Sequence, residues 1–395
     1  MPLAILLASA GHKVFGVDLS TDRINDILNL QIEPEPDVEK LLAAVINKNL
    51  FVCTSFESAL ESAAVSFLIV PTPSNEKGTF VNDFLENAIS KILENSKVEE
   101  HLICIVSTVM PGTCDYFIDS FIPSKKGNSL TKFQIAYSPE FIALGTVVKN
   151  MRTPDMILIG ARDEKSIEIL ESLQKSIVSN KPVVKCLSLA SAELAKIAVN
   201  TFVTSKISYA NMIAELSEKI PGVNKYEVLD ALGADSRIGS KYLNPGLGFG
   251  GPCFPRDNTA FGALGNSLRT NTEIALATHQ INLRQPKVIA ERINGKFRHR
   301  FSQATVLGLS YKPGSFVTEE SQAIMLIREL AEEWQTIYVH DPLVKDKKIF
   351  KNFTNIVFIE STKEIREVDL VVLAVNWPEY SDIELNHPKE NFYLV

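Results

Sequence analysis

Cysteine is scarce in this sequence and follows no pattern. The 395 residues contain five cysteines, an odd number, and none of them is paired in a C-x-x-C spacing. These features argue against a disulfide framework and a zinc site, so we expect no metal, and they favour a reducing compartment, the cytoplasm. The five are Cys53, Cys104, Cys114, Cys186 and Cys253.

Long apolar runs and an excess of basic residues are absent as well. No apolar stretch is long enough to span a bilayer, and the apolar residues 1–11 lack the basic region of a secretion signal. With 40 basic and 47 acidic residues the net charge is −7, so we expect neither nucleic acid nor a membrane surface as a partner. An apolar fraction of 45% at this length predicts a globular protein of two or three domains.

What the sequence does contain is a glycine-rich loop around one cysteine, residues 244–258 (NPGLGFGGPCFPRDN). Four glycines remove the Cβ atoms that would hold a ligand away from the backbone, and Pro252 and Pro255 fix φ on both sides of Cys253. A helix that begins near Pro255 would bring the carboxylate of Asp257 back toward the sulfur or a water beside it. The alternative interpretation is a surface loop that happens to carry a cysteine.

Strands and helices alternate along the first third of the chain. The sequence predicts strands at 13–19, 65–70, 102–107 and 134–137, and helices at 3–10 and 84–93. Asp18 stands at the end of the first strand, and three polar clusters follow the others: Thr72, Ser107 with Thr108, and Glu140. Because ligands of open α/β sheets bind at the carboxyl ends of the strands, we expect a ligand there. Ordinary helix caps explain any one of these clusters, but explain three together less easily.

The segment that usually precedes such a first helix is missing. Dinucleotide-binding folds place a strand and a G-x-G-x-x-G turn there to cradle the pyrophosphate, whereas this chain begins inside the helix at 3–10. The chain also stops in a predicted strand at 392–395. We therefore expect either truncation at both ends or a lost pyrophosphate site.

One long helical pattern fills the middle of the chain. Residues 191–220 contain neither proline nor glycine, and Pro221 follows them, which predicts a helix of about 45 Å. Helices of this length bridge domains or pack against a partner subunit. Lys196 and Asn200 share one face of it and could both approach one oxygen; the alternative is a solvated surface lysine. A second helix is predicted at 225–232.

The last third repeats the β/α pattern. Strands are predicted at 304–309, 336–340 and 369–374, with a helix at 321–333. Lys312 follows the first of these strands, where a phosphate would be expected. The sequence therefore predicts a second nucleotide-binding sheet.

The ordered set of motifs resembles the UDP-glucose/GDP-mannose dehydrogenase family, and the cysteine loop is most similar to its UDP-glucose 6-dehydrogenase branch. The motifs, in family order over nearly the whole chain, are GHKVFGVD, VPTP, STVMPGT, AYSPEFI, AELAKIAVNTF, DSRIG, GFGGPCFPRD, LGLSYKP and HDP.

The resemblance implies an α/β fold with two Rossmann-like, doubly wound parallel-sheet domains joined by the long central helix and a helical middle domain. The implied domains are an NAD-binding domain at 1–188, a central dimerisation domain at 189–285 and a UDP-sugar-binding domain at 286–395. The implied reaction is the oxidation of a nucleotide-sugar C6 alcohol to a carboxylate with two NAD, in a cytoplasmic homodimer that serves polysaccharide biosynthesis.

The resemblance also implies roles for individual residues. Cys253 attacks the C6 aldehyde, Lys196 and Asn200 stabilise its oxygen, and water is handled by Glu140, Thr108 and Asp257. The implied cofactor contacts are Asp18, Arg23, Thr72, Ser107, Thr108 and Arg256. The implied contacts to the UDP-sugar are Glu140, Phe141, Ile142, Ala143, Leu144, Lys196, Asn200, Arg237 (from a partner subunit), Tyr242, Asn244, Gly246, Gly248, Phe249, Gly250, Tyr311 and Lys312.

Three positions depart from the family pattern. Leu144 stands where many relatives have a glutamate, Asn244 replaces a frequent basic residue, and Glu319 stands at the position of a cofactor-binding arginine. A carboxylate cannot replace a guanidinium beside a pyrophosphate, and the glycine-rich turn is missing as well, so we expect the NAD affinity to be weak or absent. The alternatives are a UDP-N-acetylglucosamine, UDP-N-acetylmannosamine or GDP-mannose dehydrogenase, or a non-catalytic remnant that binds nucleotide sugar.

Overall fold

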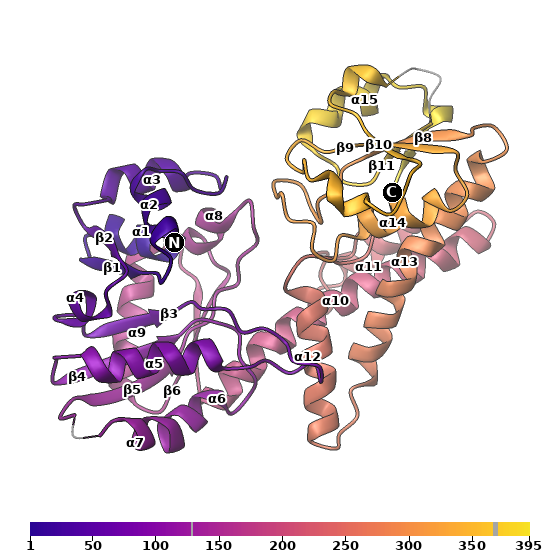
Figure 1. Cartoon of the computed structure of the whole chain (residues 1–395). Helices are drawn as coiled ribbons and strands as arrows, with labels where there is room; N and C mark the ends of the chain where they lie inside the picture. The colour runs from indigo at the N-terminus through magenta and orange to yellow at the C-terminus, as the bar shows by residue number, and fades with distance from the viewer. Residues whose placement is uncertain (128, 366–369) are drawn as a thin grey trace. The chain divides into compact units, whose positions relative to one another are not determined.

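The computed structural model describes residues 1–127, 129–365 and 370–395, which form two compact units, 1–198 and 199–395 (Figure 1). The boundary falls inside the long helix α10 (Leu189–Lys219), which agrees with the helix predicted at 191–220. None of the helices in the described ranges combines the length and the hydropathy that a bilayer span requires. The division into three domains at 188 and 285 stays a prediction.

The first unit is built around a five-stranded sheet in the order β3-β4-β5-β6-β7. Its strands are β3 (Val65–Leu68), β4 (Glu100–Ile105), β5 (Lys132–Tyr137), β6 (Met156–Ala161) and β7 (Val183–Leu187). A separate parallel pair is formed by β1 (Val14–Val17) and β2 (Leu50–Cys53). The helices are α1 (Pro2–Ser9), α2 (Thr21–Leu28), α3 (Val38–Val45), α4 (Phe56–Leu60), α5 (Asp83–Asn95), α6 (Thr113–Tyr116), α7 (Ile122–Lys125), α8 (Val147–Arg152) and α9 (Glu164–Ile177).

Strand β4 lies at the centre of this core. Its side chains alternate between two apolar clusters: Ile103 packs in the cluster that includes α5, and Leu102 packs in the cluster that includes Leu170 of α9. Both faces of the strand are therefore covered, which is why its sequence reads as a continuous apolar run. The predicted strand at 102–107 is confirmed, although it begins two residues earlier.

Two features of the first unit differ from the prediction. Strand β1 is half-buried along its whole length rather than buried. Strands β5 and β6 pair antiparallel, whereas the other neighbours in the sheet are parallel. The cause is the connection between them, because a loop and the short helix α8 bring the chain back along the same edge without a crossover.

The second unit contains a five-stranded, fully parallel sheet in the order β10-β9-β8-β11-β12. Its strands are β8 (Gln303–Leu307), β9 (Thr336–His340), β10 (Ile356–Phe358), β11 (Leu370–Leu373) and β12 (Phe392–Leu394). The chain moves outward from β8 in one direction and then returns to build the other side, so the sheet is doubly wound as predicted. Asp369, in the strand predicted at 369–374, lies outside the described residues.

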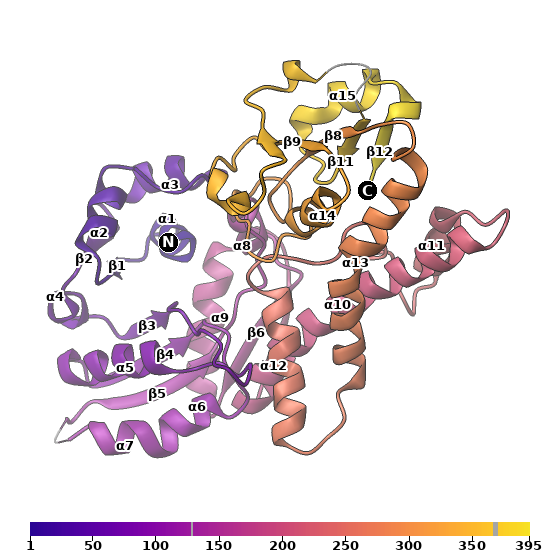
Figure 2. The ribbon, with the colours of Figure 1, turned by 45° about the vertical axis from the view of Figure 1, so that its right-hand side comes forward.

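Helices cover this second sheet and extend from it (Figure 2). They are α11 (Lys225–Ala234), α12 (Phe254–Ser267), α13 (Glu273–Phe297), α14 (Gln322–Ala331) and α15 (Ser381–Asn386). Side chains of α13 and α14 pack against Val306 and Val372 on one face of the sheet. Leu307 and Val371 face Tyr380 on the other. The sheet is thus buried on both faces, as a parallel sheet requires.

A buried histidine makes the stability of the first unit depend on pH. His101, in β4, has no exposed surface, and its ring nitrogens lie 2.8 Å from Ser66 Oγ and 2.9 Å from Ser96 Oγ. Burial lowers the pKa of His101 from 6.5 to about 4. Because the unfolded chain then binds the proton first, this contribution to stability is complete above pH 6.5 and is lost as the pH falls toward 4.

We predict that the free energy of unfolding falls by about 2 kcal/mol between pH 8 and pH 5 through His101 alone. A His101→Gln variant should be less stable at pH 8 but should lack this part of the pH dependence. Urea titrations of both proteins at the two pH values measure the difference. Equal pH dependence in the two proteins would contradict the prediction.

Candidate active site

The ends of β3 and β4 are cross-linked by hydroxyl groups. Ser107 Oγ donates to the carbonyl of Val70 at 2.7 Å and accepts from its amide at 2.9 Å. Thr72 Oγ1 donates to the carbonyl of Thr108 at 2.7 Å. The structure therefore brings together the three residues predicted to meet the nicotinamide, but it uses the protons of two hydroxyls to fix the backbone. Their oxygens can still accept hydrogen bonds from a ligand.

The turn after β4 is held by a carboxylate that the sequence interpretation missed. Glu193, fully buried near the start of α10, accepts hydrogen bonds from the amides of Gly112 and Cys114 at 2.6 and 2.7 Å. Burial raises the pKa of Glu193, and the two amides oppose that shift. The bonds fix the chain that follows Thr108 to helix α10.

One turn further along α10, Lys196 reaches the end of β5. Its Nζ donates to the carbonyl of Glu140 at 2.5 Å and lies 4.3 Å from the centroid of the Phe141 ring. Lys196 is buried, with 8% of its surface exposed, so the alternative of a solvated lysine is wrong. An ammonium held this way has a fixed position.

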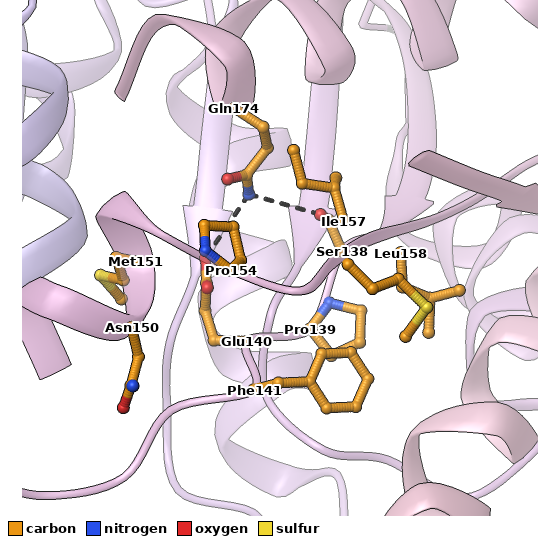
Figure 3. A pocket seen from close by; sticks show the side chains of 11 residues that line it. Ser138, Pro139, Glu140, Phe141, Asn150, Met151, Pro154, Ile157, Leu158 and Gln174 are labelled. Atoms are coloured by element: carbon orange, nitrogen blue, oxygen red, sulfur yellow. Dashed lines mark hydrogen bonds between the residues drawn. The ribbon is translucent and has the colours of Figure 1, made fainter. Parts of the chain in front are cut away.

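The Glu140 carboxyl lies beside a small polar cavity (Figure 3). Burial raises the pKa of Glu140, while the Gln174 amide and the Lys196 charge oppose the shift. Gln174 Nε2 is 3.4 Å from Glu140 Oε1 and 3.5 Å from Ser138 Oγ, so it points between the two. The cavity, of about 20 Å³, is large enough for one water. The raised pKa makes this carboxylate a stronger base than an ordinary glutamate.

Alternate amides anchor the loop after Glu140. Ala143 N donates to Asn150 Oδ1 at 2.9 Å. Gly145 N and Val147 N donate to the two oxygens of Glu35 at 2.7 and 2.8 Å. The loop is thereby fixed from two sides.

Two other amides of this loop, those of Ile142 and Leu144, are not used in this way. Ile142 and Leu144 are exposed, and no hydrogen bond from their amides is found within the described part of the chain. An anchored loop with such amides can bind the oxygens of a ligand with little loss of entropy.

The carboxyl end of β1 carries two of the residues predicted to contact NAD. Asp18 is exposed there and accepts from Ser20 N at 2.9 Å, and Arg23 pairs with Glu33 at 3.6 Å. The amino group at the start of α1 lies nearby: burial lowers the pKa of the Met1 amine, Arg23 lowers it further, and Asp18 raises it. A carboxylate suits a ribose diol, and a helix N-terminus suits a pyrophosphate, so these residues fit NAD.

In the second unit, Cys253 is the N-cap residue of α12 and is exposed. The helix predicted to begin near Pro255 begins at Phe254. Asp257 is fully buried, and its Oδ2 accepts from Asn200 Nδ2 at 2.6 Å while its Oδ1 lies 3.3 Å from Arg256 Nη2. The structure thus brings Asn200 and Asp257 together next to the cysteine loop.

The glycines of the cysteine loop serve a purpose different from the predicted one. A Cβ on Gly248 would lie 2.0 Å from Asn282 Oδ1, and one on Gly250 would lie 2.3 Å from the carbonyl of Glu320. Gly251, at φ +81°, would clash with the Tyr311 ring at 2.7 Å. These glycines admit other parts of the protein, and the prediction that the loop also admits a ligand stays a prediction.

The loop after β8 is fixed by one buried carboxylate, Asp341. It accepts from the amides of Leu309 and Ser310 at 2.8 and 3.1 Å. Lys312 Nζ lies 5.8 Å from the centroid of the neighbouring Tyr311 ring. The predicted phosphate contact is therefore carried by a turn of fixed shape, and its tyrosine packs against Gly251.

Other predicted contacts are more peripheral in the second unit. Arg237 pairs with its neighbour Asp235 at 2.5 Å and is exposed, as are Tyr242 and Asn244. Glu319 is exposed, and its carbonyl accepts from the amide of Gly251 at 3.1 Å. The departure from the family pattern at this position leaves the backbone contact intact, because that contact does not depend on the side chain.

The positioning residues missed in the sequence share one property, since each uses a side chain to bind backbone or a catalytic candidate. Only Glu35 could have been recognised from the sequence, because Pro34 and Pro36 restrict the backbone on both sides of it and so fix the position of its carboxylate. The others are Gln174, Glu193, Asn211, Asn282, Gln285 and Asp341.

Comparison with known proteins gives matches along nearly the whole chain. Three domain models of the UDP-glucose/GDP-mannose dehydrogenase family match: the NAD binding domain at residues 1–178, the central domain at 190–284 and the UDP binding domain at 305–392. A UDP-glucose 6-dehydrogenase of Haloferax volcanii is 32% identical over 97% of this chain and 90% of its own.

Solved structures agree with these sequence matches. A UDP-glucose dehydrogenase from Pyrobaculum islandicum is 30% identical and superposes with a TM-score of 0.86 over 96% of this chain and 88% of its own. A UDP-D-ManNAc dehydrogenase from Pyrococcus horikoshii is 26% identical, with a TM-score of 0.83 over 99% and 90%.

We predict that Gly251→Ala lowers the free energy of unfolding by about 3 kcal/mol, because it adds a clash with Tyr311 to an unfavourable backbone conformation. Gly239, at φ +73° with no atom within 4 Å of a Cβ, is the matched control. Gly239→Ala should cost only the backbone term, about 1 kcal/mol. Denaturant titrations measure both values, and equal losses would contradict the packing argument.

Proposed function

Because the chain belongs to the UDP-glucose/GDP-mannose dehydrogenase family and is an NAD-dependent nucleotide-sugar dehydrogenase, we propose that it oxidises the C6 alcohol of UDP-glucose to the carboxylate of UDP-glucuronate. The observation that carries the proposal is the placement of Cys253, an exposed thiol at the start of α12 in a loop of fixed shape. NAD, when bound, supplies the hydride acceptor for both two-electron oxidations.

Cys253 is the proposed nucleophile. The C6 aldehyde formed by the first oxidation cannot transfer a hydride until a nucleophile makes its carbon tetrahedral. The Cys253 thiol is that nucleophile, and its addition to the aldehyde gives a thiohemiacetal. The second oxidation gives a thioester, which water hydrolyses to the carboxylate and the thiol. The N-terminus of α12 favours negative charge that develops on the sulfur.

Lys196 and Asn200 are proposed to stabilise the charge on the substrate oxygen. They lie one turn apart on α10, and each is oriented by a hydrogen bond, Lys196 to the carbonyl of Glu140 and Asn200 to Asp257. A carboxamide nitrogen has two donors, so the bond from Asn200 to Asp257 leaves one N–H for the substrate oxygen. Such fixed donors stabilise an oxyanion without reorganisation.

Glu140, Thr108 and Asp257 are proposed to handle the hydrolytic water. The raised pKa of Glu140 lets its carboxylate accept a proton from water more readily than an ordinary glutamate would. The small cavity beside Glu140 supports this role, because it has room for a water within reach of the carboxyl.

The remaining contacts are proposed from the resemblance and from the loops described above. Asp18 and Arg23 would hold the adenosine of NAD, with Thr72, Ser107 and Arg256 toward its other half. The loop 141–144, with its two unused amides, would hold the sugar nucleotide together with the cysteine loop and Lys312. UDP-glucose is favoured over an N-acetylated sugar because the Haloferax and Pyrobaculum relatives are named for glucose.

A homodimer in the cytoplasm, serving polysaccharide biosynthesis, completes the proposal. Three large apolar residues of α10 are spaced by seven and share one exposed face: Phe202, Tyr209 and Leu216, with exposed fractions of 69%, 44% and 52%. A stripe of this kind on a long helix fits a second copy of the same helix.

We predict that the wild-type chain forms two NADH for each UDP-glucose oxidised and that Cys253→Ala lowers the rate of UDP-glucuronate formation about 1,000-fold or more. NADH absorbance and chromatography of the sugar nucleotide measure both quantities. UDP-N-acetylmannosamine and GDP-mannose, tested in parallel, should show a kcat/KM at least about 100-fold lower.

Cys186→Ala is the matched control, because Cys186 is also exposed but lies in β7. It should leave the rate unchanged. If the protein binds UDP-glucose but forms no NADH, it is the non-catalytic remnant instead. A higher kcat/KM for an N-acetylated sugar than for UDP-glucose would reject the proposed substrate.

We predict that the protein sediments as a dimer at micromolar concentration and that Leu216→Glu weakens the dimer about 100-fold, because it places a charge in an apolar contact. Leu268→Glu is the control, since Leu268 is 66% exposed and lies at the end of α12. Sedimentation velocity distinguishes the variants. A wild-type monomer, or equal weakening by both changes, would contradict the proposed face.

A further inference from the structure

The cysteine loop is held by side-chain amides rather than by backbone pairing. Asn282 Oδ1 accepts from the amide of Phe249 at 2.7 Å, and Asn282 Nδ2 donates to the carbonyl of the same residue at 2.9 Å. One side chain thus satisfies both backbone groups of one residue, as a neighbouring strand would. Asn282 is almost fully buried, with 2% of its surface exposed.

Two more amides fix the loop three residues earlier. Gln285, one turn after Asn282 on α13, donates its Nε2 to the carbonyl of Gly246 at 2.7 Å. The amide of Gly246 donates to Asn211 Oδ1 of α10 at 2.9 Å. Both backbone groups of Gly246 are therefore satisfied by side chains of two different helices, and the loop cannot slide along either helix without losing these bonds.

We call Asn282, Gln285 and Asn211 the clamp of the cysteine loop. Further contacts connect its Asn282 end to the cysteine. Phe249 is buried, and its ring meets the ring of Phe254 edge to face at 6.4 Å between centroids. Phe254 follows Cys253 directly. Because aromatic pairs of this geometry resist displacement, the position of Phe249 sets the position of the residue beside the thiol.

The glycine between Gly246 and Phe249 shows how closely the clamp fits. Gly248 passes so near to Asn282 that a Cβ would lie 2.0 Å from Oδ1. The loop and α13 are therefore fitted to each other at van der Waals distance, and only one register of the loop satisfies all the bonds.

We propose that Asn282 is a positioning residue for the reaction: it fixes the register of the cysteine loop and thereby the place of the Cys253 thiol. This inference rests on the proposed function of Cys253. Gln285 and Asn211 fix the earlier part of the loop, which is proposed to bind the sugar nucleotide. The two parts of the clamp thus have different roles: Asn282 affects the chemical step, and Gln285 affects substrate binding.

The test uses Asn282→Asp, which keeps the shape of the side chain and the acceptor but places an oxygen against the carbonyl of Phe249. We expect kcat to fall between about 10- and 100-fold, since a shift of about 1 Å in a reacting group has effects of that size. We also expect alkylation of Cys253 by iodoacetamide, followed by peptide mass spectrometry, to slow several-fold as the sulfur leaves the helix N-terminus. Asn282→Ser, which leaves space for a water, should give the same changes at smaller size if the aspartate variant does not fold.

The control is Asn355→Asp, because Asn355 Nδ2 donates to the backbone carbonyls of Ala331 and Trp334 at 2.8 and 2.9 Å, away from the cysteine loop. It should lose stability without a change in kcat or alkylation rate. Gln285→Glu should raise the KM for UDP-glucose and leave kcat unchanged.

Two results would overturn the proposal. Asn282 variants that fold and keep the wild-type kcat and alkylation rate would show that the clamp does not position the thiol. An equal loss of kcat in Asn355→Asp would show that the effect is general destabilisation. Failure of the proposed function is distinct, because it would appear as a wild-type protein that makes no NADH, while the alkylation rates would still report on Asn282.

Discussion

The structure depends on the need to satisfy polar groups buried along helix α10. Polar side chains recur on this helix at intervals of three or four residues, and each binds a different loop or helix within its own unit. Glu193 and Lys196 hold the turns after β4 and β5 in the first unit. In the second unit, four residues of α10 make hydrogen bonds of this kind: Asn200 with Asp257, Thr204 with Asn258, Ser208 with the carbonyl of Thr278, and Asn211 with the amide of Gly246. The loops of each unit are therefore fixed to the part of α10 that belongs to that unit.

Buried polar contacts explain why these loops have one conformation. Each hydrogen bond contributes only about 1 kcal/mol, but a buried partner left unsatisfied costs about 1–3 kcal/mol. A loop that moved away from Glu193 or Asn282 would leave both its own amide and the side chain unsatisfied. Apolar packing would tolerate small shifts, whereas these bonds are lost within about 0.5 Å. The loops that carry the candidate residues are thus held by directional bonds in addition to packing.

The sequence predicted the elements of both units because their periodicity is strong. The apolar run at 102–107 and the uninterrupted helical pattern at 191–220 left little choice of structure. The antiparallel pairing of β5 with β6 could not be predicted, because it depends on how the intervening loop returns and not on the strand residues themselves. In the same way Cys253 and Lys196 are recognisable by their chemistry, while Asn282 reads as an ordinary polar position on a helix. Its function depends on its contact with Phe249, which is distant in the sequence, and a local sequence pattern cannot predict that contact.

The bond between Asn200 and Asp257 shows where chemistry and folding meet. Asp257 is a fully buried carboxylate whose charge is balanced by the amide of Asn200 and by the nearby guanidinium of Arg256. Removing the Asn200 amide would take one hydrogen bond from a buried carboxylate oxygen, which costs about 1–3 kcal/mol. Asn200 therefore stabilises the start of α12, beside Cys253, before any substrate is present. A loss of activity on changing Asn200 therefore combines this structural effect with any effect on the substrate oxygen.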